Sequence, residues 1–251
     1  MKVIQMNIEE KSISKFMEEL SCSFHTNGYK KADISSLKNI PLNNRECIYL
    51  LDFTQNKIIY NRGFQNVLGY CDDEISLDFI ISNHHHEDTE MVNRISKAAI
   101  LYCMENPANV LNNVLFISYR RKKKDGSYIK ILSESHIYEI NDKGVPLKGF
   151  AKITDISFME TSDVVNWSFQ ADNLNNEAFK NQIYCDYKNF FTEREGDIIK
   201  EMEKGATNEL ISEKLNISRH TVATHRKNIF KKANRHNVED LILFCKRRGI
   251  I

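Results

Sequence analysis

The sequence lacks the features that mark membrane and exported proteins. No stretch approaches the roughly 20 apolar residues that a bilayer-spanning helix needs. Residues 1–20 carry acids where a signal peptide would be apolar. We therefore expect a cytoplasmic protein that does not contact a membrane.

Signatures of catalysis and of cofactor chemistry are also missing. The chain has no Gly-rich phosphate loop, no Ser/His/Asp set and no spaced cluster of metal ligands. Its cysteines include no CxxC pair, which predicts reduced thiols, most of them small buried hydrophobic residues. They are Cys22, Cys47, Cys71, Cys103, Cys185 and Cys245. We predict no enzyme, no metal and no identified cofactor.

The composition is that of an ordinary globular protein, with 41% hydrophobic and 27% charged residues. The net charge of +1 hides an asymmetry. From residue 191 onward there are 13 lysines and arginines against 9 acids, and residues 219–236 hold six lysines or arginines and three histidines with no acid. A positive, acid-free surface attracts polyanions, so nucleic acid is the expected partner.

The first 159 residues predict one mixed domain behind a helical extension. Residues 1–44 form the extension, with an amphipathic helix over 8–20 whose stripe holds Ile8, Ile13, Phe16, Met17 and Leu20. Residues 45–159 then predict a hairpin, a helical middle ending in a long helix, and a three-strand meander with tight turns at 124–127 and 141–144. This order is typical of an α+β domain with one antiparallel sheet.

Residues 160–189 are polar and rich in asparagine, and we interpret them as a linker. Trp167 and Phe169 suggest that part of this linker packs back onto the sheet.

The region 190–251 predicts four short helices. Thr192 and Glu195 form a capping box for the first, which ends at Gly205. The second should bury Leu210, Ile211 and Leu215. Ser218 caps the third, whose inward residues should be Val222, Ile229 and Phe230 or Ala233, and a fourth begins near Asn237. Two short helices around a tight turn, at about 207–226, with the second rich in cations, are typical of a helix-turn-helix.

These residues resemble the DNA-binding domain of the LuxR (GerE) family, over roughly residues 191–243. The resemblance lies in a Thr-x-x-Glu start, a Gly-x-x-Asn turn, Leu-x-Ile-Ser, Thr-Val-x-x-His and Asn-Ile-x-x-Lys. It implies that Ala223, Thr224 and Lys227 face the bases of double-stranded DNA. It also implies that Thr207, Thr221 and Arg226 lie near the backbone, with Lys231 on the same basic face, and that Leu241 and Cys245 on the fourth helix supply a homodimer contact. Leu210, Ser212, Ala233 and Val238 depart from the family pattern.

Residues 47–159 resemble the PAS family through the segments IYLLDFTQNKIIYN, GFQNVLGYCDDEI, HHHEDTEMV, YRRKKKDGSYIKI and ITDI. The resemblance implies a five-stranded antiparallel sheet cupped by flanking helices, a cup that often holds a ligand, and pairing between copies. Cys71 and Cys103 lack the setting of a flavin-reactive cysteine, so we interpret both as packing residues.

The interior of this domain admits two interpretations. Tyr119, Ile129, Ile131, Ile137, Tyr138 and Phe150 line either a pocket or a filled core, and the filled core is the simpler of the two. His84, His85 and His86 are adjacent rather than spaced, which disfavours a metal site.

We therefore expect a transcription regulator in which a PAS domain senses a signal, with an unidentified small molecule in its cup left open, or mediates dimerisation. The alternative is a PAS domain that serves only dimerisation or protein interaction. An enzyme built on the same sheet is a third hypothesis that no motif supports.

Overall fold

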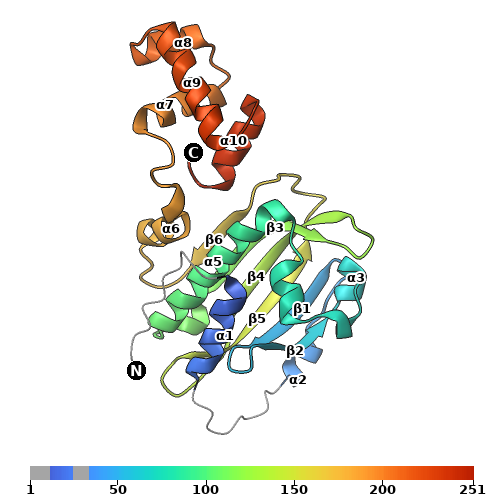
Figure 1. Ribbon diagram of the computed structural model, residues 1–251. Helices are drawn as coiled ribbons and strands as arrows, with labels where there is room; N and C mark the ends of the chain where they lie inside the picture. The colour runs from blue at the N-terminus through green and yellow to red at the C-terminus, as the bar shows by residue number, and fades with distance from the viewer. Residues whose placement is uncertain (1–11, 25–33) are drawn as a thin grey trace. The chain divides into compact units, whose positions relative to one another are not determined.

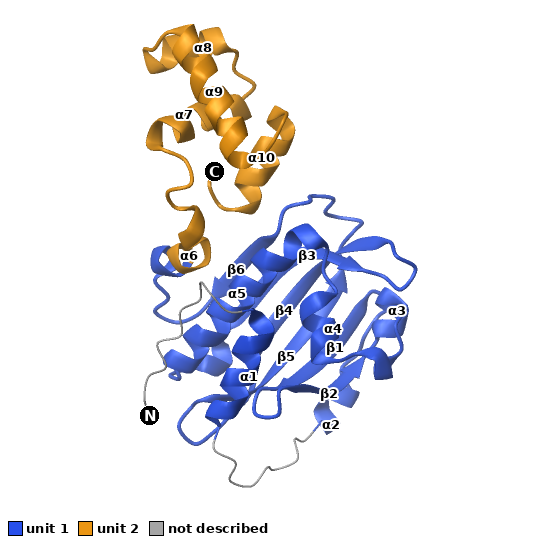
Figure 2. Cartoon of the chain, in the orientation of Figure 1, with its two compact units in different colours: residues 1–179 blue, residues 180–251 orange. Residues whose placement is uncertain are grey.

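The computed structural model describes residues 12–24 and 34–251. The chain divides into two compact units, residues 1–179 and 180–251 (Figure 2). Helix α6 (Asn176–Tyr184) contains the boundary between them.

The N-terminal unit is built on one antiparallel sheet in the order β2-β1-β5-β4-β3-β6. Its strands are β1 (Glu46–Asp52), β2 (Lys57–Arg62), β3 (Val114–Lys122), β4 (Tyr128–Ile140), β5 (Pro146–Asp155) and β6 (Asn166–Gln170). The expected five-stranded antiparallel sheet is thus present, and a sixth strand extends it beside β3.

The predicted linker contributes that sixth strand. Leu115 of β3 pairs with Phe169, and Ile117 pairs with Trp167. The two aromatic residues that suggested packing onto the sheet therefore belong to an edge strand, and residues 160–189 are largely structured rather than a free linker.

Helices cover both faces of this sheet. They are α1 (Ile13–Ser23), α2 (Ser35–Lys38), α3 (Phe64–Leu68), α4 (Leu77–Ser82) and α5 (His86–Glu105), with short 3-10 turns η1 (Asp72–Glu74) and η2 (Val110–Asn112). Figure 1 and Figure 2, in which α4 is labelled, show α1, α4 and α5 on one face. On the other face, Leu37 of α2 packs in one cluster with Ile48 and Leu50.

The predicted N-terminal helix is present but begins later than expected. Ser12 caps it by accepting a hydrogen bond from the Lys15 amide. Phe16 and Met17 are buried, and α1 packs against α4 and α5. Ile8, which we placed on its stripe, lies outside the described residues. Because α1 and α2 both pack on the sheet domain, the described part of 1–44 belongs to the N-terminal unit.

The C-terminal unit is helical. After η3 (Cys185–Tyr187) it contains α7 (Glu193–Glu203), α8 (Asn208–Leu215), α9 (Arg219–Ala233) and α10 (Val238–Arg247). The predicted capping box at Thr192 and Glu195 is present, and Gly205 follows α7 with φ of +77°. Among the described residues, no helix combines the length and apolar character needed to cross a membrane.

The core of this unit follows the predicted periodicity with one correction. Ile211, Val222, Ile229 and Ala233 are buried, and Phe230 is only partly so. Leu210, however, is 56% exposed, so its predicted burial was wrong. It stands at the third position of α8, where the Thr207 hydroxyl accepts from its amide and its side chain points to solvent while Ser212 turns inward.

The cysteines are all free, and half of them are buried. Cys47, Cys103 and Cys245 are buried, whereas Cys22 and Cys71 are exposed. The interpretation of Cys71 as a packing residue was therefore wrong. It caps η1, and its thiol lies 3.1 Å from the side-chain Oε1 atom of Gln65.

Candidate functional site

The helix-turn-helix is formed by α8 and α9, with a tight turn between them. Asn216 ends α8 in the left-handed conformation, with φ of +51°, and the Ile217 amide returns to the Ser212 carbonyl oxygen. Ser218 then starts α9, where its hydroxyl accepts from the Thr221 amide. A left-handed asparagine followed two residues later by a capping serine lets the two helices meet across a very short turn.

The predicted base-facing residues lie together on α9. Ala223, Lys227 and Lys231 are spaced by four residues, with Thr224 beside them, and all four side chains are exposed. A spacing of four puts side chains on one stripe of a helix. The Thr224 hydroxyl donates to the His220 carbonyl oxygen at 3.1 Å, which fixes the orientation of this side chain.

The cations of this unit divide into paired and unpaired groups. Lys232 contacts Glu195 at 2.6 Å, Lys214 contacts Glu201 at 2.9 Å, and Arg219 contacts Glu209 at 3.3 Å. In contrast, Lys227 and Lys231 have no acidic partner among the described residues. The same holds for the half-buried Arg226. Two cations without an acidic partner in the described ranges, Lys227 and Lys231, therefore lie on the stripe that the resemblance assigns to DNA.

The paired lysines stabilise the scaffold under this stripe. Burial opposes ionisation of Glu195, but the Lys232 ammonium group and hydrogen bonds from Thr192 outweigh it and lower the pKa of this carboxyl group. Lys204 and Lys214 likewise lower the pKa of Glu201. These contacts tie α9 and α8 to α7 and hold the stripe in place.

The two threonines predicted near the DNA backbone both stand at helix starts. Thr207 caps α8, and its exposed hydroxyl accepts from the Leu210 amide. Thr221 lies in the first turn of α9, where its hydroxyl is 2.8 Å from that of Ser218. Helix N-termini favour phosphate through their free amides and dipole.

The two residues predicted to make the dimer contact lie inside their own domain. Leu241 and Cys245 have 0% of their surface exposed and belong to the core of the C-terminal unit. Burial raises the pKa of the Cys245 thiol to about 12. Any contact of α10 with a second copy therefore has to come from another face of the helix, on which Ile242 and Leu243 are partly exposed.

The N-terminal unit contains a cavity of about 110 Å³ between the sheet and α5. The filled core expected from the sequence is therefore incomplete: Ile137 and Phe150 line the cavity, while Tyr119 and Ile131 are buried away from it. The strands contribute Tyr49, Leu51, Leu115, Ser135, Gly149 and Phe169, and α5 contributes Ser96, Ala99, Ile100 and Cys103.

Residues with polar side chains, among them Tyr49, Ser96 and Asn113, also line this cavity, and the side-chain amide of Asn113 donates to Cys103 Sγ at 3.6 Å. A mostly apolar cavity with a few polar groups is the usual form of a small-molecule site. Sequence reasoning missed Ser96, Asn113 and Phe169, because their convergence depends on how α5 and β6 pack.

A buried cation lies near the opposite end of β3. Arg121 has 0% of its surface exposed, and its guanidinium donates to the Tyr119 hydroxyl at 3.1 Å and to the Ile80 carbonyl oxygen at 3.2 Å. His84 is 7% exposed, and its ring packs on the Tyr119 ring with 4.9 Å between the two ring centroids. Burial, and then the charge of Arg121, lower the pKa of His84 to about 3.

The other two histidines of the triplet lie at the start of α5. His85, His86 and Glu87 form the one group of possible metal ligands among the residues described, with their ligand atoms within 4.8 Å of one another. The Arg120 guanidinium lies 3.1 Å from the Glu87 carboxylate and would oppose a cation there.

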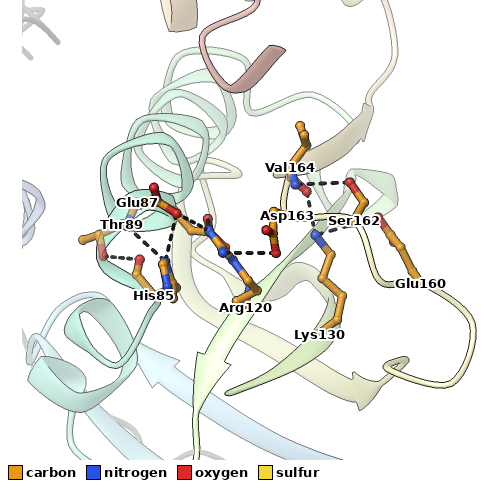
Figure 3. Close-up of polar contacts among 10 residues, drawn as sticks. His85, Glu87, Thr89, Arg120, Lys130, Glu160, Ser162, Asp163 and Val164 are labelled. Atoms are coloured by element: carbon orange, nitrogen blue, oxygen red, sulfur yellow. Dashed lines mark hydrogen bonds and ion pairs between the residues drawn. The ribbon is translucent and has the colours of Figure 1, made fainter. Parts of the chain in front are cut away.

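Arg120 belongs to a cluster of ion pairs shown in Figure 3. Its guanidinium contacts Asp88 at 2.6 Å and Asp163 at 3.1 Å. Lys130, whose side chain is 4% exposed, donates to the Val164 carbonyl oxygen at 2.5 Å and lies 3.7 Å from Glu160. Two cations on neighbouring strands thus hold residues 160–164 against the sheet and the start of α5.

Comparison with known proteins identifies the C-terminal segment. The family described as GerE, "Bacterial regulatory proteins, luxR family", matches residues 189–245. The nitrate/nitrite response regulator protein NarP of Escherichia coli is 44% identical over 59 residues, which are 23% of this chain and 27% of NarP. The uncharacterized transcriptional regulatory protein YxjL of Bacillus subtilis is 39% identical over 61 residues, 24% of this chain and 28% of YxjL. The chain thus spans little more than a quarter of either relative.

Two kinds of protein are among the solved structures to which this chain is similar. One is the VqmA dimer of Vibrio cholerae, described as a LuxR-type receptor and solved in the absence of target DNA. The match covers 86% of this chain and 87% of the VqmA chain, with 14% sequence identity and a TM-score of 0.34. The N-terminal domain of a diguanylate cyclase with PAS/PAC sensor from Marinobacter aquaeolei covers 45% of this chain and 97% of its own at 18% identity, with a TM-score of 0.36.

Proposed function

Because residues 189–245 are a helix-turn-helix domain of the LuxR type, we propose that this chain regulates transcription as a homodimer that binds duplex DNA sequence-specifically. Such a regulator acts where the chromosome is, so we place it in the cytoplasm. The observation that carries the proposal is the stripe of exposed residues on α9, whose two lysines have no acidic partner in the described structure.

The stripe has the form that major-groove recognition requires. We assign Ala223, Thr224 and Lys227 to the base edges, where a small apolar side chain and a methyl group suit thymine and a lysine suits guanine. Lys231 and the half-buried Arg226 are then suited to phosphates farther along the groove.

The helix starts supply further backbone contacts. We assign the hydroxyls of Thr207 and Thr221 to phosphates that approach the N-termini of α8 and α9. Two copies would place their recognition helices in half-sites about 10 base pairs apart, as two-fold helix-turn-helix proteins do. The partly exposed face of α10 is our candidate for contact between the C-terminal units, in place of the buried Leu241 and Cys245.

For the N-terminal unit we favour a sensing role over a purely dimeric one. A domain that serves only association needs no interior space, and unfilled volume costs stability. The mostly apolar cavity, with a few polar residues in its lining, instead supports the binding of a small molecule. If the cavity binds nothing, the unit reverts to the alternative of a dimerisation or protein-interaction module.

The test begins with genomic footprinting of the tagged chain, which yields the operator and the spacing of its half-sites. Affinity for that operator is then compared between the wild type and Lys227→Ala. Loss of a lysine that reads a guanine edge should weaken binding by about 1–3 kcal/mol and relax specificity at that base pair.

The matched control is Lys143→Ala, which removes the same charge from an exposed turn of the N-terminal unit. It should leave the affinity unchanged. If Lys227→Ala binds the operator as tightly as the control does, with the same dependence on salt, the assignment of α9 to the groove is wrong.

A further inference from the structure

The exposed stripe of α9 continues to the N-terminal end of the helix. His220, Thr224, Lys227 and Lys231 follow one another at intervals of four, three and four residues, and all four are exposed. Such intervals return side chains to the same face of a helix. The stripe that we assign to DNA therefore extends to His220, in the first turn of α9.

The buried side of α9 shows which residues point directly away from the core. Val222, Ile229 and Ala233 are buried and define the inward direction. At about 100° per residue, His220 lies about 20° from the opposite, outward direction, whereas Ala223 lies about 80° from it. His220 is thus better centred on the exposed face than Ala223, the first of the residues assigned to the bases.

The His220 side chain is available for a partner outside the chain. Its ring makes no hydrogen bond, ion pair or ring contact to another described residue, while its carbonyl oxygen accepts from the Thr224 hydroxyl at 3.1 Å. The neighbouring guanidinium of Arg219 lies 3.3 Å from the Glu209 carboxylate on α8. The first turn of α9 therefore presents an imidazole on the stripe, while its arginine is held by α8.

The first turn is also the part of a recognition helix that meets the bases. In helix-turn-helix proteins the N-terminal residues of the second helix contact base edges in the major groove. The N–H group of an imidazole donates a hydrogen bond, and guanine presents two neighbouring acceptors there, N7 and O6. Guanine is therefore the base that best complements a histidine at this position.

His220 and Lys227 would contact different base pairs. They are seven residues apart, and seven residues of α-helix span about 10.5 Å. Successive base pairs lie about 3.4 Å apart along the duplex. For a helix that lies along the groove, the two side chains thus reach positions about three base pairs apart.

We propose that His220 is a specificity-determining residue that reads a guanine about three base pairs from the base read by Lys227. The proposal rests on the DNA-binding function proposed above and adds a second contacted base to each half-site. Arg219 supports this contact indirectly, because its pairing with Glu209 keeps a longer cation away from the same base.

The test uses the full chain and the operator obtained by footprinting. Each base pair is replaced in turn in both half-sites, and the affinity of every duplex is measured for the wild type, His220→Ala and Lys227→Ala. The wild type should prefer guanine at the position read by His220. His220→Ala should lose at least about fivefold of this preference and keep the preference at the Lys227 position, and Lys227→Ala should do the reverse.

His220→Asn distinguishes a base contact from a structural role. A carboxamide pairs with N6 and N7 of adenine, so this variant should change the preference at the same position from guanine to adenine. A residue that only stabilised α9 would not redirect a base preference. The matched control is His236→Ala, which removes an exposed histidine that follows α9 and should keep the base preferences of the wild type.

Two outcomes would overturn the proposal. An equal loss of affinity of His220→Ala for every duplex would show a phosphate contact, and wild-type preferences in both His220 variants would show that the side chain does not reach the bases. In both cases the wild type still binds its operator, so the proposed function stands. A wild-type chain that bound no duplex would instead remove the function and this proposal together.

Discussion

The buried His84 should make the N-terminal unit sensitive to acid. Its ring contacts Tyr119, its neighbour Arg121 is a fully buried cation, and its Nδ1 atom has no partner among the described residues. Protonation in the folded state would place a second positive charge beside the guanidinium. We predict that His84→Gln, which keeps an amide near the Ile80 carbonyl oxygen but does not titrate, removes this sensitivity.

The size of the effect follows from the pKa of His84 in the folded and unfolded states. It is about 3 in the folded chain and 6.5 as the ordinary value. Above pH 6.5 neither state is protonated and the histidine has no effect on stability. As pH falls from 6.5 to 3, only the unfolded chain takes up the proton, so the free energy of unfolding drops. The total loss is about 5 kcal/mol, of which about 3 kcal/mol is reached by pH 4.5.

Urea unfolding of the wild type and of His84→Gln at several pH values between 7.5 and 4.5 measures this loss. Trp167 emission follows the N-terminal unit, since the only tryptophan lies in it. Other acid-sensitive groups contribute equally to both proteins, so the difference between them isolates His84. The stability of the wild type should fall relative to the variant by about 1.4 kcal/mol per pH unit below pH 6. A difference that stays constant across the range would show that His84 titrates freely and that our account of its burial is wrong.

Three further predictions concern single contacts, each checked by chemical or thermal unfolding. Leu210→Glu should stabilise the C-terminal unit by about 0.5–1 kcal/mol, because a glutamate at the third position of α8 completes a capping box with Thr207; a loss of stability would contradict the exposed placement of this leucine. Asp163→Asn should weaken the contact of residues 160–164 with Arg120, seen as faster amide exchange in that segment while the sheet is unchanged, and equal exchange in both proteins would refute the role of this contact. Gly63→Ala should destabilise the N-terminal unit by several kcal/mol or prevent folding, since φ is +93° and a Cβ atom would lie 2.5 Å from the Glu46 carbonyl oxygen; unchanged stability would show that this turn has another conformation.

The helices of the C-terminal unit could be located from the sequence because their boundaries depend on local chemistry. Thr192 and Ser218 cap helices by accepting from a backbone amide three residues on, as predicted, and Asn237 does the same where the fourth helix was expected to begin. Such contacts involve neighbours in the chain and need no knowledge of the fold. The residues assigned to the exposed stripe of α9, in contrast, came from the resemblance to the LuxR family.

Features that depend on contacts between residues far apart in the sequence could not be predicted from the sequence alone. Leu210 and Ile211 are adjacent apolar residues, and only the packing of α8 decides that Ile211 alone is buried. The cavity exists because side chains from five strands and one helix leave space among them, which no local pattern records. Arg120 and Asp163 form an ion pair although they are far apart in the sequence. Arginine and aspartate most often lie exposed to solvent, so nothing in the sequence marks these two residues as partners.

The pairing of β6 with β3 has a consequence for solubility. With β6 in place, Val114–Ser118 of β3 are hydrogen-bonded on both sides. If the strand detached, β3 would present a row of free amides and carbonyls, the kind of edge on which other chains add strands. The same segment that connects the two units therefore also shields the sheet from aggregation. A variant in which β6 no longer pairs with β3 should swap this strand with a second copy or precipitate. It should not stay in solution as a single chain with an unpaired β3 edge.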